Sequence, residues 1–360
     1  MRIAIDISQI IYGTGVSVYT KNLVETLIRL HPEVEFVLFG GSFRRRDELK
    51  QFVKRHHASG KIYPLSPRFL DLLWNSFHIY PIENLIGQVD LIHTSDWTEP
   101  PSKIPKVTTI HDLIALKYPS HNIHLSHRKK LAWVVRESKA ILAVSQSTKN
   151  DLVDILKIDP NKITVTYEGV EPLFQPQPPD VIDRVKRKYH IDGEYIFSLS
   201  TLEPRKNQAR LIEAYQKVKK DFPNLKLVIG GRTGWGDGIT PVPGVILPGF
   251  IPNVDQPGLY SGCLLYALPS LYEGFSLSHL QAMACGAPVV TSNTSSMPEV
   301  VGKAGVLVDP ENIEDITAGI IKAIKSRSDL SQKSLERSKL FTWEETARTT
   351  FSVYQQVINE

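Results

Sequence analysis

Arg205 and Lys206 are residues of this sequence whose types and spacing point directly to chemistry. They lie in the stretch TLEPRKN, between an apolar run typical of a strand and a helical pattern, and Asn207 follows them as the expected N-cap of that helix. Two positive side chains beside the N-terminus of a helix repel its positive end unless an anion is bound there. The pair therefore predicts an anion site, with a solvated surface pair as the structural alternative.

A carboxylate and an amide mark a second stretch, PSLYEGFSLSHLQAMACGAPVV. Glu273 follows an apolar strand pattern, and the backbone N–H groups of residues 274–276 precede a helix that we expect to begin near Leu277. Backbone N–H groups at the N-terminus of a helix bind phosphate readily. Gln281 lies about one helical turn further along, where it can face the same cleft. A helix cap at Glu273 and a polar helix-face residue at Gln281 are the structural alternative.

Two weaker signals lie in the first half of the chain. Gly13 and Gly15 follow a strand pattern and open a helix, so the backbone can approach a phosphate, but Val18 stands where a dinucleotide fingerprint needs another glycine. His111 and Asp112 end another strand pattern, and a satisfied buried histidine is the structural alternative there. Metal binding is not expected, because no second His or Cys lies at ligand spacing and the sequence contains no Asp-x-Asp pair.

The elements that must position these residues alternate along all 360 residues. Short apolar runs such as RIAIDI, YIFSLS and LKLVIGG are separated by helical patterns, which predicts α/β domains with doubly wound parallel sheets. Ligands of open sheets bind beyond the carboxyl ends of the strands, and all four stretches fall at such ends.

A proline-rich segment divides the chain near its middle. Pro172, Pro176, Pro178 and Pro179 cannot continue a strand or helix and indicate a linker. We therefore expect a Rossmann-like domain at 1–170, a linker at 171–183, a second Rossmann-like domain at 184–341 and a C-terminal helix at 342–360 that crosses back to the first domain.

Composition excludes several classes of protein. The formal net charge is only +4, which gives no case for nucleic acid as the main partner. The sequence has two cysteines, Cys263 and Cys285, both in apolar surroundings, and two buried free thiols fit a reducing cytoplasm. The N-terminus opens directly as a strand pattern without the apolar core of a signal peptide, and no apolar run is long enough for a membrane span. We expect a cytoplasmic protein.

Together and in this order, the four stretches resemble the retaining nucleotide-sugar glycosyltransferases of group 1. The resemblance covers nearly the whole chain; TLEPRKN and the EGF turn followed by AMACGAPVV are its specific parts. It implies the GT-B architecture, in which two Rossmann-like domains face each other across a cleft. It also implies that the first domain binds the acceptor and the second binds the nucleotide sugar.

The resemblance assigns roles residue by residue. Arg205 and Lys206 would hold the donor diphosphate and stabilise charge on the leaving nucleotide, in place of a divalent metal. Gly15 would let the N-terminal loop close over the phosphates. His111 would approach the donor sugar near its reacting carbon, and Glu273 would bind sugar hydroxyls.

Gln281 departs from the family pattern. The family's Glu-x7-Glu motif has a second glutamate at this position, which grips the ribose, and an amide accepts such a bond without the charge that strengthens it. The other donor-binding residues that the resemblance implies are Gly13, Asn207, Ile251, Gly274, Phe275, Ser276 and Leu277.

The function implied is that of a mannosyltransferase-like enzyme of polysaccharide biosynthesis. It would move a hexose, mannose or glucose, from GDP-mannose or a UDP-hexose to a glycan or lipid-linked acceptor, with retention and without a metal or cofactor. Two alternatives stay open: a nucleotide-sugar-binding protein with weak or no transferase activity, and a phosphorylase or epimerase of related fold.

The acceptor side carries an open question at residues 66–86. Phe69, Leu72, Leu73, Phe77 and Tyr80 have near-helical spacing, which favours packing in the core. An apolar acceptor groove and a face for peripheral contact with the inner side of a membrane are the alternatives. The basic runs at 44–46 and 128–130 could meet anionic lipid, although charge runs are more often merely solvated.

Overall fold

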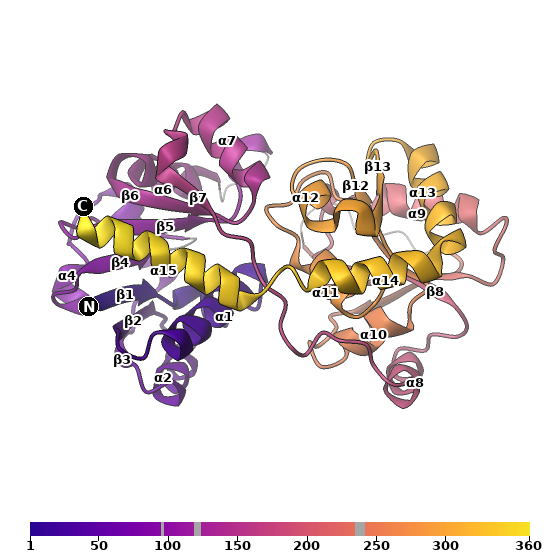
Figure 1. Cartoon of the computed structure of the whole chain (residues 1–360), viewed down its shortest axis with the longest axis horizontal. Coiled ribbons are helices and arrows are strands. Elements are labelled where there is room, and N and C mark those ends of the chain that lie inside the picture. Colours follow the sequence, from indigo (N-terminus) through magenta and orange to yellow (C-terminus); the bar gives the residue numbers. More distant parts are fainter. Residues whose placement is uncertain (95–96, 119–123, 235–241) are drawn as a thin grey trace. The chain divides into compact units, whose positions relative to one another are not determined.

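The computed structural model describes residues 1–94, 97–118, 124–234 and 242–360. It divides into two compact units, named here unit 1 (Met1–Gly169 and Trp343–Glu360) and unit 2 (Val170–Thr342). Each unit contains one parallel sheet with helices packed against it (Figure 1). The predicted α/β class with two doubly wound sheets is confirmed.

Unit 1 has a seven-stranded sheet in the order β3-β2-β1-β4-β5-β6-β7. The order reverses between β1 and β4, and open sheets bind ligands beyond the carboxyl ends of the strands at such a point. The strands are β1 (Arg2–Asp6), β2 (Glu35–Gly41), β3 (Ser59–Tyr63), β4 (Leu91–Thr94), β5 (Lys106–Ile110), β6 (Ser138–Ala143) and β7 (Ile163–Val165). The helices are η1 (Ser8–Ile11), α1 (Gly15–Leu30), α2 (Arg46–Arg55), α3 (Pro67–Leu70), η2 (Asp71–Ser76), α4 (Glu83–Ile86), α5 (Ile114–Lys117), α6 (His124–Glu137), α7 (Gln146–Leu156), η3 (Pro160–Lys162) and α15 (Trp343–Asn359).

The last helix, α15, packs in unit 1, where it lies beside α1 (Figure 1). The ring of His31, just after α1, stacks on Phe351 with ring centroids 3.5 Å apart. The hydroxyl of Tyr354 hydrogen-bonds Nδ1 of His93 in β4 at 2.5 Å. Aromatic and polar contacts thus join the end of the chain to the core of the first sheet.

Unit 2 repeats the same plan with six strands in the order β10-β9-β8-β11-β12-β13. Its order reverses between β8 and β11. The strands are β8 (Tyr195–Leu199), β9 (Lys226–Gly230), β10 (Val245–Gly249), β11 (Leu265–Leu268), β12 (Val289–Ser292) and β13 (Gly305–Val308). The helices are α8 (Pro179–Lys188), η4 (Pro204–Lys206), α9 (Gln208–Val218), α10 (Gln256–Gly262), α11 (Leu277–Ala284), α12 (Met297–Val301), η5 (Gly302–Ala304), α13 (Ile313–Lys325) and α14 (Arg327–Ser338).

The proline-rich segment differs from our expectation at its end. Helix α8 begins at Pro179, inside the stretch 171–183 that we expected as linker. Proline fits the first position of a helix, because the N–H it lacks has no partner within the helix there. The last prolines of the segment therefore start a helix.

The apolar stretch at 66–86 also differs from our expectation. Only some of its large side chains enter the core, among them Leu70, Trp74 and Ile82. Phe69 and Leu72 are exposed, as are Phe77 and Tyr80, so the core-packing interpretation is wrong for them. Leu70 and Trp74 are the core residues of this stretch instead, and Leu73 is half-buried against them. Beyond Leu70, η2 is a π-helix, whose wider turns break the regular helical spacing that the interpretation assumed.

The remaining expectations about the whole chain concern cysteines and membrane spans. Cys263 and Cys285 are buried free thiols, as predicted. Among the described residues, no helix combines the length and apolar character that crossing a membrane requires.

Candidate active site

The two specific stretches of unit 2 meet because their strands are neighbours. Arg205 and Lys206 follow β8 and Glu273 follows β11, and these strands pair in parallel with Tyr266 opposite Phe197. Parallel strands present their carboxyl ends at the same edge of the sheet. At this edge the cations and the carboxylate lie between β8 and β11, where the strand order reverses. The topology alone therefore brings the cations to the carboxylate.

Glu273 joins the two cations. Lys206 Nζ donates to Glu273 Oε1 at 2.6 Å and to Oε2 at 2.8 Å, and Arg205 Nη1 donates to Oε2 at 3.1 Å. The side chain of Glu273 is 8% exposed, against 11% for Arg205 and 15% for Lys206. Arg205 also pairs with Glu203 and donates to the backbone carbonyl of Tyr272. This charge cluster (Glu203, Arg205, Lys206 and Glu273) is partly buried and held from several sides.

The charge cluster changes one inference from the sequence. We argued that the two cations need an anion to offset their repulsion, and Glu203 and Glu273 already supply two negative charges. Neither cation is a merely solvated surface group. The cluster thus holds the cations in place before any ligand binds, which is what electrostatic preorganisation requires.

Ionisation in the charge cluster follows from burial and pairing. Burial by itself would raise the pKa of Glu273, but the charges of Lys206 and Arg205 and the hydrogen bond from Lys206 lower it to about 2. Burial lowers the pKa of Lys206, as does the neighbouring charge of Arg205, while Glu273 opposes both effects. Glu273 is therefore an anion at neutral pH, and it helps to keep Lys206 protonated.

The turn after Glu273 is fixed from its other side. The hydroxyls of Ser295 and Ser296 donate to the carbonyl of Glu273 at 2.5 and 3.0 Å. Phe275 is buried, and Ser276 at the start of α11 has a left-handed backbone with φ of 69°. Helix α11 begins at Leu277, as predicted.

A buried histidine holds Ser276. His279 Nε2 donates to the carbonyl of Leu268 at the end of β11 at 3.1 Å, so Nδ1 is the acceptor for the Ser276 hydroxyl. Burial lowers the pKa of His279 to about 4, which keeps the ring neutral and preserves this tautomer at neutral pH. The start of α11, with its backbone N–H groups, is thereby tied to the end of its own strand.

Asn207 stands at the N-cap position of α9, but its side chain does not cap the helix. Instead Nδ2 donates to the carbonyls of Pro269 at 2.9 Å and Pro310 at 2.7 Å. The capping interpretation is wrong in this respect, because the left-handed backbone of Asn207, with φ of 61°, directs the amide to loops after β11 and β13. Asn207 joins three loops at the carboxyl edge of the sheet.

Two further predicted donor-binding residues lie in buried places. Gln281 on α11 is 8% exposed. Ile251, which follows β10, is a core residue whose side chain packs against Gly230 at the end of β9. Any contact of Ile251 with a ligand would therefore use its backbone.

In unit 1 the glycine loop follows β1, beside the point where the strand order reverses. Gly13 has φ of 67°, a backbone that favours glycine, and Gly15 is the first residue of α1. The Thr14 and Ser17 side chains form a reciprocal capping box at the start of α1. The loop is thus shaped to present a helix N-terminus.

Asp6, at the end of β1, is a residue that the sequence analysis missed. Its Oδ1 accepts a hydrogen bond from the backbone N–H of Ser8 at 2.8 Å, which fixes the first turn of the loop. Burial raises the pKa of Asp6, against the hydrogen bonds from Ser8 and Gln9 and the charge of Lys130. An acidic residue at the end of the first strand pattern was the signal available in the sequence.

His111 follows β5 and is buried in a second polar group of unit 1. Its Nδ1 lies 3.3 Å from Oε1 of Glu168, and the ring of Tyr19 meets it edge-on with centroids 4.7 Å apart. Burial raises the pKa of Glu168, whereas the hydrogen bond and charge of His111 lower it. Glu168 was also missed, although it follows β7 and so lies at the carboxyl edge of the sheet. Asp112 accepts a hydrogen bond from the N–H of Ile114 at 2.9 Å and starts α5.

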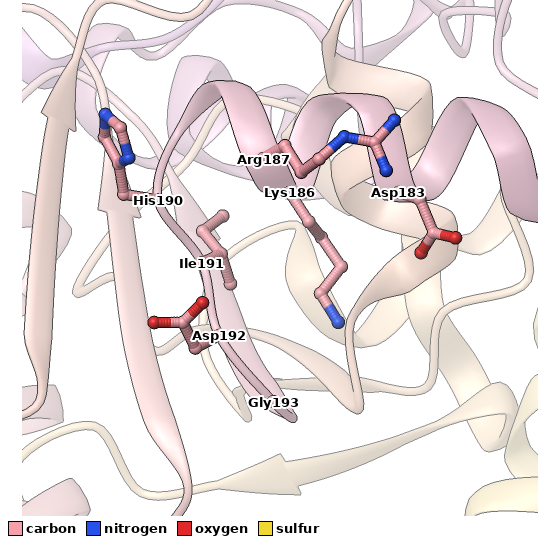
Figure 2. A pocket seen from close by; sticks show the side chains of 7 residues that line it. All are labelled: Asp183, Lys186, Arg187, His190, Ile191, Asp192 and Gly193. Atoms are coloured by element: carbon pink, nitrogen blue, oxygen red, sulfur yellow. The ribbon is translucent and has the colours of Figure 1, made fainter.

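Within the described residues, no group of three His, Cys, Asp or Glu side chains could hold a metal ion. A polar cavity of about 470 Å³ lies at the end of α8, before β8 begins, and Figure 2 shows its charged side chains. It is lined by Asp183, Lys186, Arg187, His190, Ile191, Asp192 and Gly193. Because the cavity precedes β8 and the charge cluster follows it, the two lie at opposite ends of this strand.

The fold and the charge cluster define an α/β protein with two doubly wound sheets and a charged site at the carboxyl ends of the strands of unit 2, and comparisons with known proteins narrow this class. Residues 13–172 match the model of glycosyltransferase family 4, and residues 181–339 match the model of glycosyl transferases group 1. Together the two models cover most of the chain, so the chain belongs to the glycosyltransferases that they describe, and the resemblance to glycosyltransferases of group 1 is confirmed.

Relatives and solved structures agree with this assignment. The chain is 28% identical to O-antigen chain mannosyltransferase B of Escherichia coli over 367 residues, which cover 95% of this chain and 96% of the relative. The structure of sucrose-phosphate synthase from Thermosynechococcus elongatus matches with a TM-score of 0.76 at 18% identity and covers 100% of this chain and 99% of that one. The Anabaena protein HepE in complex with UDP and glucose matches with a TM-score of 0.71 at 18% identity, over 98% of this chain and 99% of that one. The fold is GT-B.

Proposed function

We propose that this glycosyltransferase moves a hexose from a nucleotide-diphosphate sugar to a glycan or lipid-linked acceptor, with retention of configuration and without a metal. The observation that carries the proposal is the charge cluster at the carboxyl edge of unit 2. The named mannosyltransferases among the relatives favour mannose as the sugar, and hence GDP-mannose as the first donor to test. The UDP bound to HepE makes a UDP-hexose the second.

In the proposed reaction the bond between the sugar carbon and the diphosphate oxygen breaks, and the acceptor hydroxyl oxygen bonds to that carbon. Negative charge grows on the departing diphosphate, and the acceptor's hydroxyl proton passes to that diphosphate or to solvent water. Arg205 and Lys206 would stabilise that charge, because they are fixed cations in a partly buried place. The N–H groups at residues 274–277 would contribute to binding sugar and phosphate.

Glu273 would bind sugar hydroxyls and hold the cations. It is not assigned as a nucleophile, because both of its oxygens already accept hydrogen bonds from Lys206. Gln281, Asn207 and the backbone of Ile251 are proposed to complete the donor-binding set of unit 2.

Unit 1 would contribute His111 near the reacting carbon and the loop from Gly13 to Gly15 near the phosphates. It would also bind the acceptor, and we propose a peripheral contact with the inner face of a membrane. The fold supports a ligand site in unit 1, since its open sheet has a reversal of strand order, as the sheet of unit 2 has.

Transfer assays with a panel of nucleotide sugars test this function. The chain is incubated with GDP-mannose, UDP-glucose and related donors, with and without EDTA. Release of the nucleotide diphosphate is measured with a glycan extract as acceptor and with water alone, to which the sugar can pass by slow hydrolysis. We expect release with one donor and no loss in EDTA. Loss in EDTA with rescue by Mg²⁺ or Mn²⁺ would contradict the metal-independent mechanism, and no release with any donor would contradict the donor class.

A further inference from the structure

Residues 66–80 of unit 1 carry a cluster of exposed apolar side chains. Phe69, Leu72, Phe77, Ile79 and Tyr80 have between 47% and 64% of their surface exposed to solvent. They come from one short segment, α3, η2 and the turn that follows. Single exposed apolar residues are ordinary, but clustered aromatic and aliphatic side chains indicate a surface that binds something.

Buried anchors hold this segment in place. Trp74 is fully buried, and its Nε1 donates to the carbonyl of Tyr80 at 3.1 Å. Asn75 is 1% exposed; its Oδ1 accepts from the N–H of Glu99 at 2.9 Å, and its Nδ2 donates to the carbonyl of Trp97 at 2.8 Å. Turning the exposed side chains inward would break these buried hydrogen bonds, and a buried group without its partner is costly. The exposure is therefore built into the fold.

The backbone of the segment is unusual in a second way. Helix η2 is a π-helix, and His78 and Tyr80 have left-handed backbones with φ of 51° and 66°. Such conformations are unfavourable for residues other than glycine and persist where surrounding contacts hold them, often at functional places. His78 is held by stacking on Trp133 with ring centroids 3.5 Å apart, and by a 2.6 Å contact with Glu137.

Helix α6 adds positive charge beside this segment. Trp133 Nε1 of α6 donates to the carbonyl of Asn75 at 3.0 Å, and Lys129 Nζ donates to the Ser76 hydroxyl at 3.1 Å, so the two elements are adjacent. Arg128 and Lys129 of the basic run are exposed, whereas Lys130 is buried, so only two residues of the run can meet lipid or solvent.

Charge on the surface of the two segments has one sign. Arg68, Arg128, Lys129 and Arg136 are exposed. The acidic side chain of Asp71 bonds Asn75 and Ser126. Within the described ranges 66–80 and 125–136, every exposed charge is therefore a cation.

We infer that the exposed side chains of residues 66–80 and 125–136, named here the apolar-cationic face, bind the surface of an anionic lipid bilayer. Aromatic and aliphatic side chains that enter the boundary between head groups and acyl chains, flanked by Lys and Arg, have the chemistry of an interfacial membrane contact. This inference deepens the peripheral contact proposed above by assigning its surface and the lipid charge. The binding itself does not depend on the proposed transfer reaction.

Vesicle binding by the full chain tests the apolar-cationic face. Cosedimentation is measured with vesicles of phosphatidylcholine alone and of phosphatidylcholine with phosphatidylglycerol, for the wild type, Leu72→Ser/Phe77→Ser and Arg68→Gln/Arg128→Gln. Both variants change exposed side chains, and circular dichroism checks their folding. Leu340→Ser is the matched control, because Leu340 is 66% exposed and lies in unit 2.

We expect the wild type and Leu340→Ser to bind the anionic vesicles and to bind neutral ones much more weakly. Removal of two cations should weaken binding to anionic vesicles by roughly thirtyfold, and the double serine variant should lose it to a similar degree or more. Equal binding to both vesicle types, no binding by the wild type, or unchanged binding by both variants would overturn the inference. So would a wild-type dimer in solution that Leu72→Ser/Phe77→Ser converts to a monomer, since a second copy would then cover the face.

Nucleotide release without an added lipid acceptor separates this inference from the proposed function. All variants should release the nucleotide diphosphate from the donor at the wild-type rate. Vesicle binding without release would leave the face intact and contradict the proposed transferase; release without vesicle binding would do the reverse.

Discussion

Replacement of Lys206 by Met tests whether the charge cluster acts in catalysis or only in folding. Lys206 donates to both carboxylate oxygens of Glu273, at 2.6 and 2.8 Å, and Arg205 donates to one of them at 3.1 Å. Removal of one partner of a buried ion pair costs about 3–5 kcal/mol. Because Arg205 remains, we expect a loss near the lower end, about 3 kcal/mol. For a domain of this size, that lowers the Tm of unit 2 by roughly 6–12 °C.

The double variant Lys206→Met/Glu273→Gln separates the two roles. It removes the cation and the carboxylate charge together, so we expect it to recover part of the stability that Lys206→Met loses. Turnover should not recover, because the departing diphosphate still lacks one fixed positive charge. The loss of one such group costs about 10²–10³ in kcat. A double-mutant cycle is completed by measuring thermal unfolding and nucleotide release on the wild type, both single variants and the double variant.

Recovery of turnover along with stability in the double variant would refute the catalytic role of Lys206. Lys333→Met is the matched control: Lys333 pairs with Asp329 on the surface of unit 2, with 49% and 62% of the two side chains exposed. Exposed pairs contribute about 0–1 kcal/mol, so this variant should keep both Tm and turnover.

Three further predictions concern single side chains. Gln281→Glu should keep kcat and lower the donor KM by several-fold, since a charged acceptor bonds a hydroxyl more strongly by about 1 kcal/mol. Gln281→Leu should raise the donor KM. Donor titrations that show a large loss of affinity in Gln281→Glu, or no change of affinity in Gln281→Leu, exclude the ribose role. Glu168→Gln should lower kcat by about tenfold with little change in KM, because His111 loses a charged partner that fixes its ring; a change confined to Tm would indicate a structural role. Glu273 has a pKa lowered to about 2 from its ordinary 4.5, so its stabilising contribution is present above pH 4.5 and lost as the pH falls through about 2. Urea titrations should show that the free energy of unfolding falls less steeply with pH in this window for Glu273→Gln than for the wild type. Equal slopes in the two proteins would contradict the lowered pKa.

The fold and the main site residues of unit 2 could be predicted from the sequence for a physical reason. Strands buried on both faces read as continuous apolar runs, and alternation with helices forces them into parallel sheets. The carboxyl ends of such strands meet at one edge, so Arg205, Lys206 and Glu273 could be placed near one another without coordinates. Asp6 and Glu168 obey the same rule and could have been chosen by it.

Other features needed coordinates because they depend on contacts across the chain. The neutralisation of Arg205 by Glu203 is a matter of side-chain direction, and neither residue type predicts it. At residues 66–80 the near-helical spacing assumed regular turns, whereas a π-helix and two left-handed residues redirect the side chains. Spacing indicates a face only while the backbone is regular.

Balanced charge in the cluster of unit 2 has a consequence for how it would work. Two cations alone at this place would repel each other and the N-terminus of α9, and they would have to be ordered again each time a donor bound. Glu203 and Glu273 remove that repulsion and fix the directions of Arg205 and Lys206 beforehand. The negative charge that grows on a departing diphosphate would then meet two cations that need little further movement, and charges fixed in this way lower the free-energy barrier of a reaction. Glu273 acts on the sugar and on the cations in this scheme, so no single substitution of it can separate the two effects, whereas the cycle with Lys206 can.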